Sequence, residues 1–94
     1  MTDPASASER IDAPAVVLTC ITLLASKAWE AMGLVPDSAT KQIERRLDEA
    51  QLAIDAAAAL ADLIRNRLPD AERRELETLL TNLRLNYVEQ RAKG

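Results

Sequence analysis

The chain has 94 residues and a formal net charge of -3, and it contains no Phe, no His, one Trp, one Tyr and one Cys. A chain of this length forms one small domain with a thin core, and with so few aromatic rings alanine and leucine must fill that core. The missing histidine excludes Ser-His-Asp triads and histidine zinc sites, and interleaved acidic and basic residues disfavour nucleic acid as a partner.

The N-terminal segment, residues 1–11, is rich in Ser and Ala, and we expect a disordered tail there. The apolar run at residues 13–25 is shorter than the roughly 20 residues that cross a bilayer. The segment before this run is mainly acidic, whereas an export signal begins with positive charge. We therefore expect neither a transmembrane span nor a signal peptide, and we interpret the run as part of a core helix.

A first helix is predicted over about residues 12–32. Asp12 is a suitable N-cap, and Pro14 fits in the first turn, where a missing N–H costs nothing. Gly33 follows the helix at the position that favours a left-handed backbone, and Pro36 prevents the helix from resuming. These two residues form the clearest helix stop in the sequence.

Most of the circumference of this first helix is apolar, since its polar positions follow a single stripe of Thr19, Thr22, Ser26 and Glu30. Such a helix requires neighbours on several sides. The core or interface positions expected on it are Val17, Ile21, Leu24 and Trp29.

The single cysteine, Cys20, lies within this apolar helix and has no second cysteine with which to form an internal disulfide. Its neighbours predict a small buried hydrophobe in a reducing compartment, which favours a cytoplasmic location. Without a base partner it is not expected to act as a nucleophile.

A second helix is predicted to begin between Ser38 and Leu47 and to end near Arg67. The segment "SATKQIERR" contains no helix breaker, so we place the helix at about residues 40–67. A stripe with alternating steps of three and four residues matches the seam of a helix pair; it consists of Ile43, Leu47, Ala50, Ile54, Ala57, Ala61, Ile64 and Leu68. Alanine in the middle of a seam lets two helices approach closely, with Ile54, Ala57, Ala61 and Ile64 as the expected core or interface positions.

The alanine content of the second helix has two interpretations. A further flank of Ala53, Ala56, Leu60 and Leu63 widens its apolar face beyond what one neighbour would cover. Alanine also has the highest helix propensity, and the alternative is that these residues only stiffen a surface helix.

A third helix is predicted over about residues 70–91, because Pro69 ends the second helix and leaves a very short connection. A short connection makes two helices antiparallel neighbours. Its core stripe is Leu76, Leu79, Leu80, Leu83 and Tyr87, with Leu80 and Leu83 as interface or core residues. Leu85 lies well off this stripe and indicates a second contact surface.

The predicted fold is an all-α, three-helix antiparallel hairpin or bundle in one domain, residues 12–91, completed by homodimerisation. The chain resembles the bacterial family called domain of unknown function 1844 over about residues 15–89. The resemblance rests on three separated motifs, "MGLVPDS", "LDEAQLAID" and "ETLLTNLRLNYVEQ". The positions that match are Gly33, Pro36, Asp37, Ala50, Ile54, Asp55, Leu79, Leu80, Leu83, Arg84, Leu85, Tyr87, Val88 and Glu89. The resemblance supports the helical fold and implies no activity. Relatives carry a Gly- or Pro-containing loop before the second helix, so we expect this helix to begin earlier here.

No catalytic, cofactor-binding or metal-binding residues are predicted, and the chain is not expected to be an enzyme. The carboxylates Asp48, Asp55 and Asp62 repeat every seven residues, which is more typical of a solvated face than of a cation site. The carboxylate of Asp55 has Arg84 and Tyr87 as possible partners on the antiparallel third helix. We interpret these three as a structural polar set that determines helix register.

The sequence favours a non-enzymatic helical self-association or scaffold module, with a homodimer as the expected assembly. The alternative is a small accessory subunit of a larger, possibly membrane-bound, complex that docks through the first helix. Nucleic-acid binding through scattered arginines is disfavoured, because acidic residues interleave them and aromatic platforms are missing.

Overall fold

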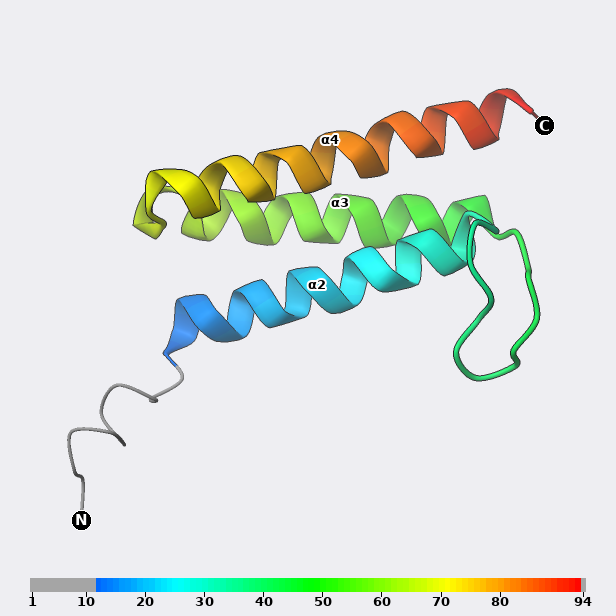
Figure 1. Ribbon diagram of the computed structural model, residues 1–94, viewed down its shortest axis with the longest axis horizontal. Coiled ribbons are helices and arrows are strands. Elements are labelled where there is room, and N and C mark those ends of the chain that lie inside the picture. The colour runs from blue at the N-terminus through cyan, green and yellow to red at the C-terminus, as the bar shows by residue number, and fades with distance from the viewer. Residues whose placement is uncertain (1–11, 94) are drawn as a thin grey trace, which may run out of the picture.

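A computed structural model describes residues 12–93 and consists of helices that run lengthwise beside one another (Figure 1). The elements in chain order are α2 (Ala13–Ala31), α3 (Leu47–Ile64), the 3-10 helix η1 (Arg65–Arg67) and α4 (Asp70–Ala92). Consecutive α-helices run antiparallel, and the described residues form no strand beyond an isolated bridge. This confirms the predicted all-α fold with three helices. The expected disordered tail, residues 1–11, lies outside the described residues.

Both ends of α2 follow from local chemistry, as predicted. The carboxylate of Asp12 accepts a hydrogen bond from the Ala15 N–H at 3.0 Å and caps the helix. At the other end Gly33 adopts a φ of 78°, and its N–H donates to the Glu30 carbonyl at 3.0 Å. The Leu34 N–H donates to the Trp29 carbonyl at 3.2 Å, which completes a Schellman motif.

Helix α3 begins at Leu47, which corrects the expected start near residue 40. The segment before it is a loop because Asp37 organises a turn. Asp37 Oδ1 accepts hydrogen bonds from the backbone N–H groups of Ala39 at 2.8 Å and Thr40 at 3.0 Å. Asp side chains that bond the backbone in this way favour turns over helices. Lys41 then takes a φ of 62°, in the left-handed region that ends any helical path.

The end of this loop is tied back to α2. The Arg46 N–H donates to the Ala31 carbonyl at 2.7 Å, and Met32 and Arg45 form an isolated antiparallel bridge. The Arg45 guanidinium also donates to the carbonyl of Gln90 near the end of α4. Ile43, predicted as the first residue of the helix seam, is therefore an exposed loop residue.

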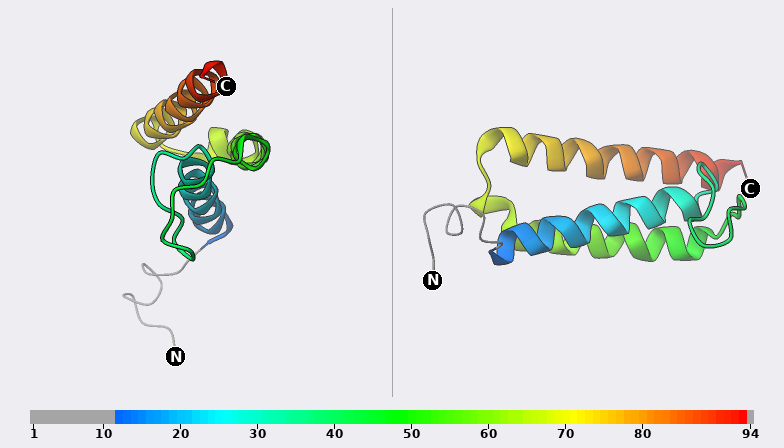
Figure 2. Two further views of the ribbon diagram at one scale, coloured as in Figure 1. Left: turned by 90° about the vertical axis from the view of Figure 1, so that its right-hand side faces the viewer. Right: turned by 60° about the horizontal axis from the view of Figure 1, so that its bottom comes forward.

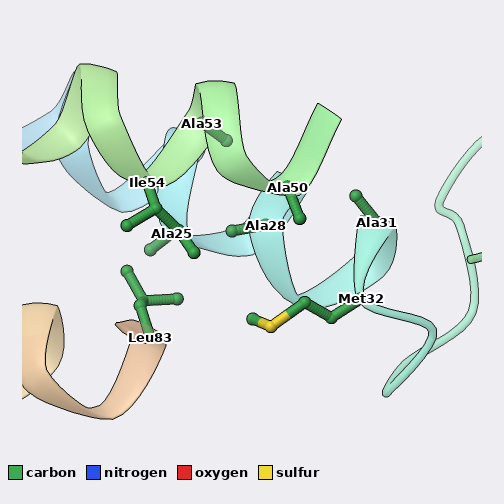
Figure 3. Close-up of a cluster of buried hydrophobic side chains, with 8 residues drawn as sticks. All are labelled: Ala25, Ala28, Ala31, Met32, Ala50, Ala53, Ile54 and Leu83. Carbon is green, nitrogen blue, oxygen red and sulfur yellow. The ribbon is translucent and has the colours of Figure 1, made fainter. Parts of the chain in front are cut away.

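The helices α2 and α3 meet along a face of alanines. Figure 3 shows Ala25, Ala28 and Ala31 of α2 beside Ala50 and Ala53 of α3, with larger side chains closing the cluster. Alanine side chains hold two helix axes at the short end of the roughly 8–10 Å range. The α2–α3 contact is the most extensive contact between elements of the described chain.

Helix α4 lies along one side of the α2–α3 pair (Figure 2). It packs there through leucines. Pro69 occupies its N-cap position, and the chain turns through η1 and Leu68 to reach it. A second buried cluster joins all three helices and consists of Ile21, Ala57, Ala61, Ile64, Leu68, Leu76 and Leu80. Helix α4 contacts α3 far more than α2.

Candidate functional site

The predicted core or interface residues lie inside a single copy of the chain. Seven are buried: Ile21, Ile54, Ala57, Ala61, Ile64, Leu80 and Leu83. Val17, Leu24 and Trp29 are half-buried and pack against the two clusters. These ten positions therefore contribute to the core between α2, α3 and α4 of one copy.

The polar set predicted from Asp55, Arg84 and Tyr87 is divided between two contacts. Arg84 Nη1 lies 3.7 Å from Asp55 Oδ1, and more than half of each side chain is exposed. The Tyr87 hydroxyl instead donates to Oε1 of Gln51 at 3.2 Å. Both contacts join α3 to α4 and line a shallow groove with Ile54 and Val88.

The polar groups of this groove contact side chains of the neighbouring helix. Its carboxylate faces a guanidinium, and its phenol donates a hydrogen bond to an amide oxygen. An exposed pair of this kind contributes little to stability, because water screens both charges. The groove therefore contributes only a weak polar contact between α3 and α4.

The three repeated carboxylates of α3 are exposed, and two of them have basic partners. Asp55 pairs with Arg84, while Asp62 pairs with Arg65, which also bonds Glu77 of α4. The hydrogen bond to Glu77, followed by that to Asp62, raises the pKa of Arg65. Within residues 12–93 no three His, Cys, Asp or Glu side chains are grouped to hold a metal ion.

The loop between α2 and α3 carries a second polar cluster, centred on Asp37. The backbone N–H groups of Thr40 and Ala39, followed by the hydrogen bond from Lys27, lower the pKa of Asp37 to about 2. The same contact, 3.2 Å from Lys27 Nζ to Asp37 Oδ2, raises the pKa of Lys27. This cluster holds the loop against α2, and sequence analysis had identified Asp37 only as part of a family motif.

Cys20 is exposed, so its predicted burial is wrong. The sequence showed an apolar helix, but only one side of that helix faces α3 and α4. Ile21, Ala25, Ala28 and Ala31 occupy the inward side, and Cys20 lies away from it.

Large apolar side chains remain exposed on each of the three α-helices. The most exposed on each helix are Leu23 (66%) on α2, Leu52 (70%) and Leu63 (73%) on α3, and Leu85 (63%) and Val88 (63%) on α4. Leu63 and Leu85 lie on flanks that the sequence had marked as additional contact surfaces. Leu52 was missed, although the helical period places it opposite the inner seam of α3.

Helix α2 has a further property among the described elements: by length and composition alone it is apolar enough to cross a membrane. Core helices of soluble proteins share this property, and α2 contributes four buried residues to the bundle. Its outward side exposes Val16 and Leu23.

Comparison with known proteins identifies the family but no function. The model of a family described as "Domain of unknown function (DUF1844)" matches residues 14–89. No curated protein and no solved structure matches the chain.

Proposed function

The chain belongs to the family described as a domain of unknown function (DUF1844), and we propose that it is a non-enzymatic helical module that associates with a second copy of itself. The observation that carries this proposal is the exposure of Leu52 and Leu63 on α3, the helix that also forms the centre of the core. A helix that packs on its inner side and exposes leucines on its outer side is typical of a protein with a further neighbour.

Burial energetics favour covering these side chains. Each Å² of apolar surface removed from water contributes about 25 cal/mol, so a buried leucine contributes about 1.5–3 kcal/mol relative to an exposed one. In a dimer with a two-fold axis, the same residues of both copies are buried in the interface. Self-association thus extends a core that is thin in a single copy.

The polar residues support a role without catalysis. The carboxylates of Asp37, Asp55 and Asp62 contact basic side chains, and Asp37 also caps a turn. Such contacts hold loops and helices in place, which is a structural role.

The test is the molar mass of the purified chain in solution over a wide concentration range. We expect sedimentation equilibrium or light scattering to show a reversible change from monomer to dimer. A mass that stays monomeric up to millimolar concentration contradicts the proposal.

A second candidate function is an accessory subunit that docks through α2 onto a larger, possibly membrane-bound, complex. The supporting observation is the length and apolar composition of α2, together with its exposed Val16 and Leu23. Flotation with lipid vesicles distinguishes the two: an accessory subunit that enters membranes floats with the vesicles, whereas a soluble dimer stays at the bottom of the gradient.

A further inference from the structure

The side of α3 that points away from both other helices carries two leucines and two alanines. We call this set the outer α3 face; it consists of Leu52, Ala56, Ala59 and Leu63. The helical period places these residues opposite the buried seam of α3. Their steps of four, three and four residues are those of the seam between two packed helices. The outer α3 face therefore has the pattern of a helix that packs against one more helix.

The outer α3 face is accessible to a partner. Ala59 is exposed and Ala56 is half-buried. Leu52 and Leu63 are 70% and 73% exposed, and they are the most exposed large apolar side chains of residues 12–93. The buried Ala53 lies in the cluster with α2 and is not part of this face. Exposed leucines grouped on one side of a helix are typical of an interaction surface.

The outer α3 face has the same residues at the same spacing in both directions along the helix. Its leucines lie at the two ends, its alanines lie between them, and its centre is the midpoint between Ala57 and Ala58. An antiparallel second copy centred at this midpoint sets leucine against leucine at both ends and alanine against alanine in the middle. The alanines then let the two α3 backbones approach closely, as α2 and α3 do within one copy.

The charges at the two ends of α3 also favour an antiparallel pair. The first turn of α3 carries Asp48 and Glu49, whereas the η1 turn that follows α3 carries Arg65 and Arg67. Asp48 and Arg67 are equally far from the centre of the outer α3 face. An antiparallel pair therefore brings the acidic end of each copy close to the basic end of the other. A parallel pair brings acidic ends together and basic ends together, which destabilises an interface.

The border of the outer α3 face toward α4 carries charges of both signs. Asp55 contacts Arg84 of α4, and Asp62 contacts Arg65. In the antiparallel pair, the Asp55–Arg84 contact of one copy lies beside the Asp62–Arg65 contact of the other. Each carboxylate at this border then has a guanidinium of its own copy beside it and a second one nearby. Acidic and basic groups thus alternate along the border, which favours the association of the two copies.

We propose that α3 packs antiparallel against α3 of a second copy through the outer α3 face, with the two-fold axis at the midpoint between Ala57 and Ala58. This inference rests on the proposed function, because it names the surface and the orientation of the same self-association. A two-fold axis buries the same four residues of both copies. Leu52 and Leu63 supply most of the apolar surface that leaves water.

The first experiment compares Leu52→Glu and Leu63→Glu with Leu23→Glu by sedimentation equilibrium of the full chain. Each α3 variant should raise the dimer dissociation constant by about 100-fold or more, because it buries a charge in the interface twice per dimer. Leu23 is the matched control, since it is 66% exposed and lies on α2. Leu23→Glu should change the constant by less than about 3-fold. All three side chains are exposed in one copy, so circular dichroism should show folded helices in every variant.

The second experiment determines the orientation of the pair from disulfides between copies. Ala56→Cys and Ala59→Cys are made separately in a Cys20→Ser background. Antiparallel packing sets position 56 of one copy against position 59 of the other, whereas parallel packing sets each position against itself. A disulfide requires Cα atoms about 4.4–6.8 Å apart. With oxidised glutathione as the oxidant, an equal mixture of the two variants should form linked dimers about 10-fold faster than either variant alone.

The outcomes separate this inference from the proposed function. If the original chain stays monomeric, both are overturned. If the chain dimerises but Leu52→Glu and Leu63→Glu weaken the dimer no more than Leu23→Glu does, another surface forms the interface, and the inference is overturned while the proposed function stands. A mixture of the two cysteine variants that cross-links no faster than either variant alone overturns the antiparallel orientation and with it the inference.

Discussion

Helix α3 packs against its two neighbours in different ways. Toward α2 it presents alanines to alanines, and the two helices make the most extensive contact in the described chain. Toward α4 it meets Leu76, Leu80 and Leu83, and this contact is less extensive. Small alanine side chains thus let the backbones of α2 and α3 approach each other. Between α3 and α4, large leucine side chains bury apolar surface instead.

The lengths of the connecting segments do not follow the extent of these contacts. Helices α2 and α3 are joined by the long loop of residues 32–46, whereas α3 and α4 are joined by η1, Leu68 and Pro69. The pair with the longer connection nevertheless makes the more extensive contact. Side-chain size at the seam, and not loop length, therefore sets how closely two helices approach in this protein. The following predictions test that conclusion, from the largest expected effect to the smallest.

Leu83→Ala should have the largest effect, because it removes the fully buried side chain that α4 contributes to the alanine cluster. Leucine-to-alanine changes at such sites lower the free energy of unfolding by about 2–5 kcal/mol, depending on how far the cavity collapses. Urea unfolding at a fixed protein concentration measures this change. Leu85→Ala, at an exposed site two residues away, should cost less than about 0.5 kcal/mol.

Ala57→Leu tests the alanine interface by the opposite change. Ala57 is fully buried on the inner side of α3, and a larger side chain forces the backbones of the bundle apart. We expect the free energy of unfolding to fall by about 1–3 kcal/mol. Ala59→Leu is the control on the exposed side of the same helix. Equal melting temperatures for the two variants would show that the helices are not closely packed at Ala57.

The loop that joins α2 and α3 should weaken at low pH. The pKa of Asp37 is lowered from 3.8 to about 2, so its ionised carboxylate stabilises the folded loop above pH 3.8. This stabilisation is lost as the pH falls from 3.8 through 2. NMR titration of the Asp37 carboxyl carbon should give the lowered midpoint. In Asp37→Ala the melting temperature should depend less steeply on pH across this interval.

Arg84→Ala should have the smallest effect. Both partners of the Asp55–Arg84 pair are more than half exposed, and such pairs contribute below about 1 kcal/mol. Chemical unfolding should show a loss within about 0.5 kcal/mol, diminishing further in high salt. A loss comparable to that of Leu83→Ala would mean that this polar pair, and not leucine burial, holds α4 in place.

Sequence reasoning succeeded where structure depends on nearby residues. Asp12 caps α2, Gly33 ends it in a Schellman motif, and Pro69 separates α3 from α4. The inner seam of α3 was also identified correctly from Ala50 to Leu68, because burial on one side of a helix imposes its period on the residues.

Sequence prediction failed where the local sequence allowed two outcomes, either helix or loop for a segment, or burial or exposure for a side chain. The segment before Leu47 contains no helix breaker, yet Asp37 and Lys41 make a turn whose later residues bond back to α2. The first helix is apolar on most sides, so its sequence alone did not show that Cys20 and Leu23 would remain outside.

The sequence by itself determined the number of helices, most of their ends and the inner side of α3, since caps, breakers and helical period act within a few residues of the chain. Only the tertiary structure decided which side of α2 faces inward, that Tyr87 bonds Gln51, and which leucines stay in water. Those outcomes depend on how residues distant in sequence pack together, and several faces of an apolar helix satisfy the local rules equally well.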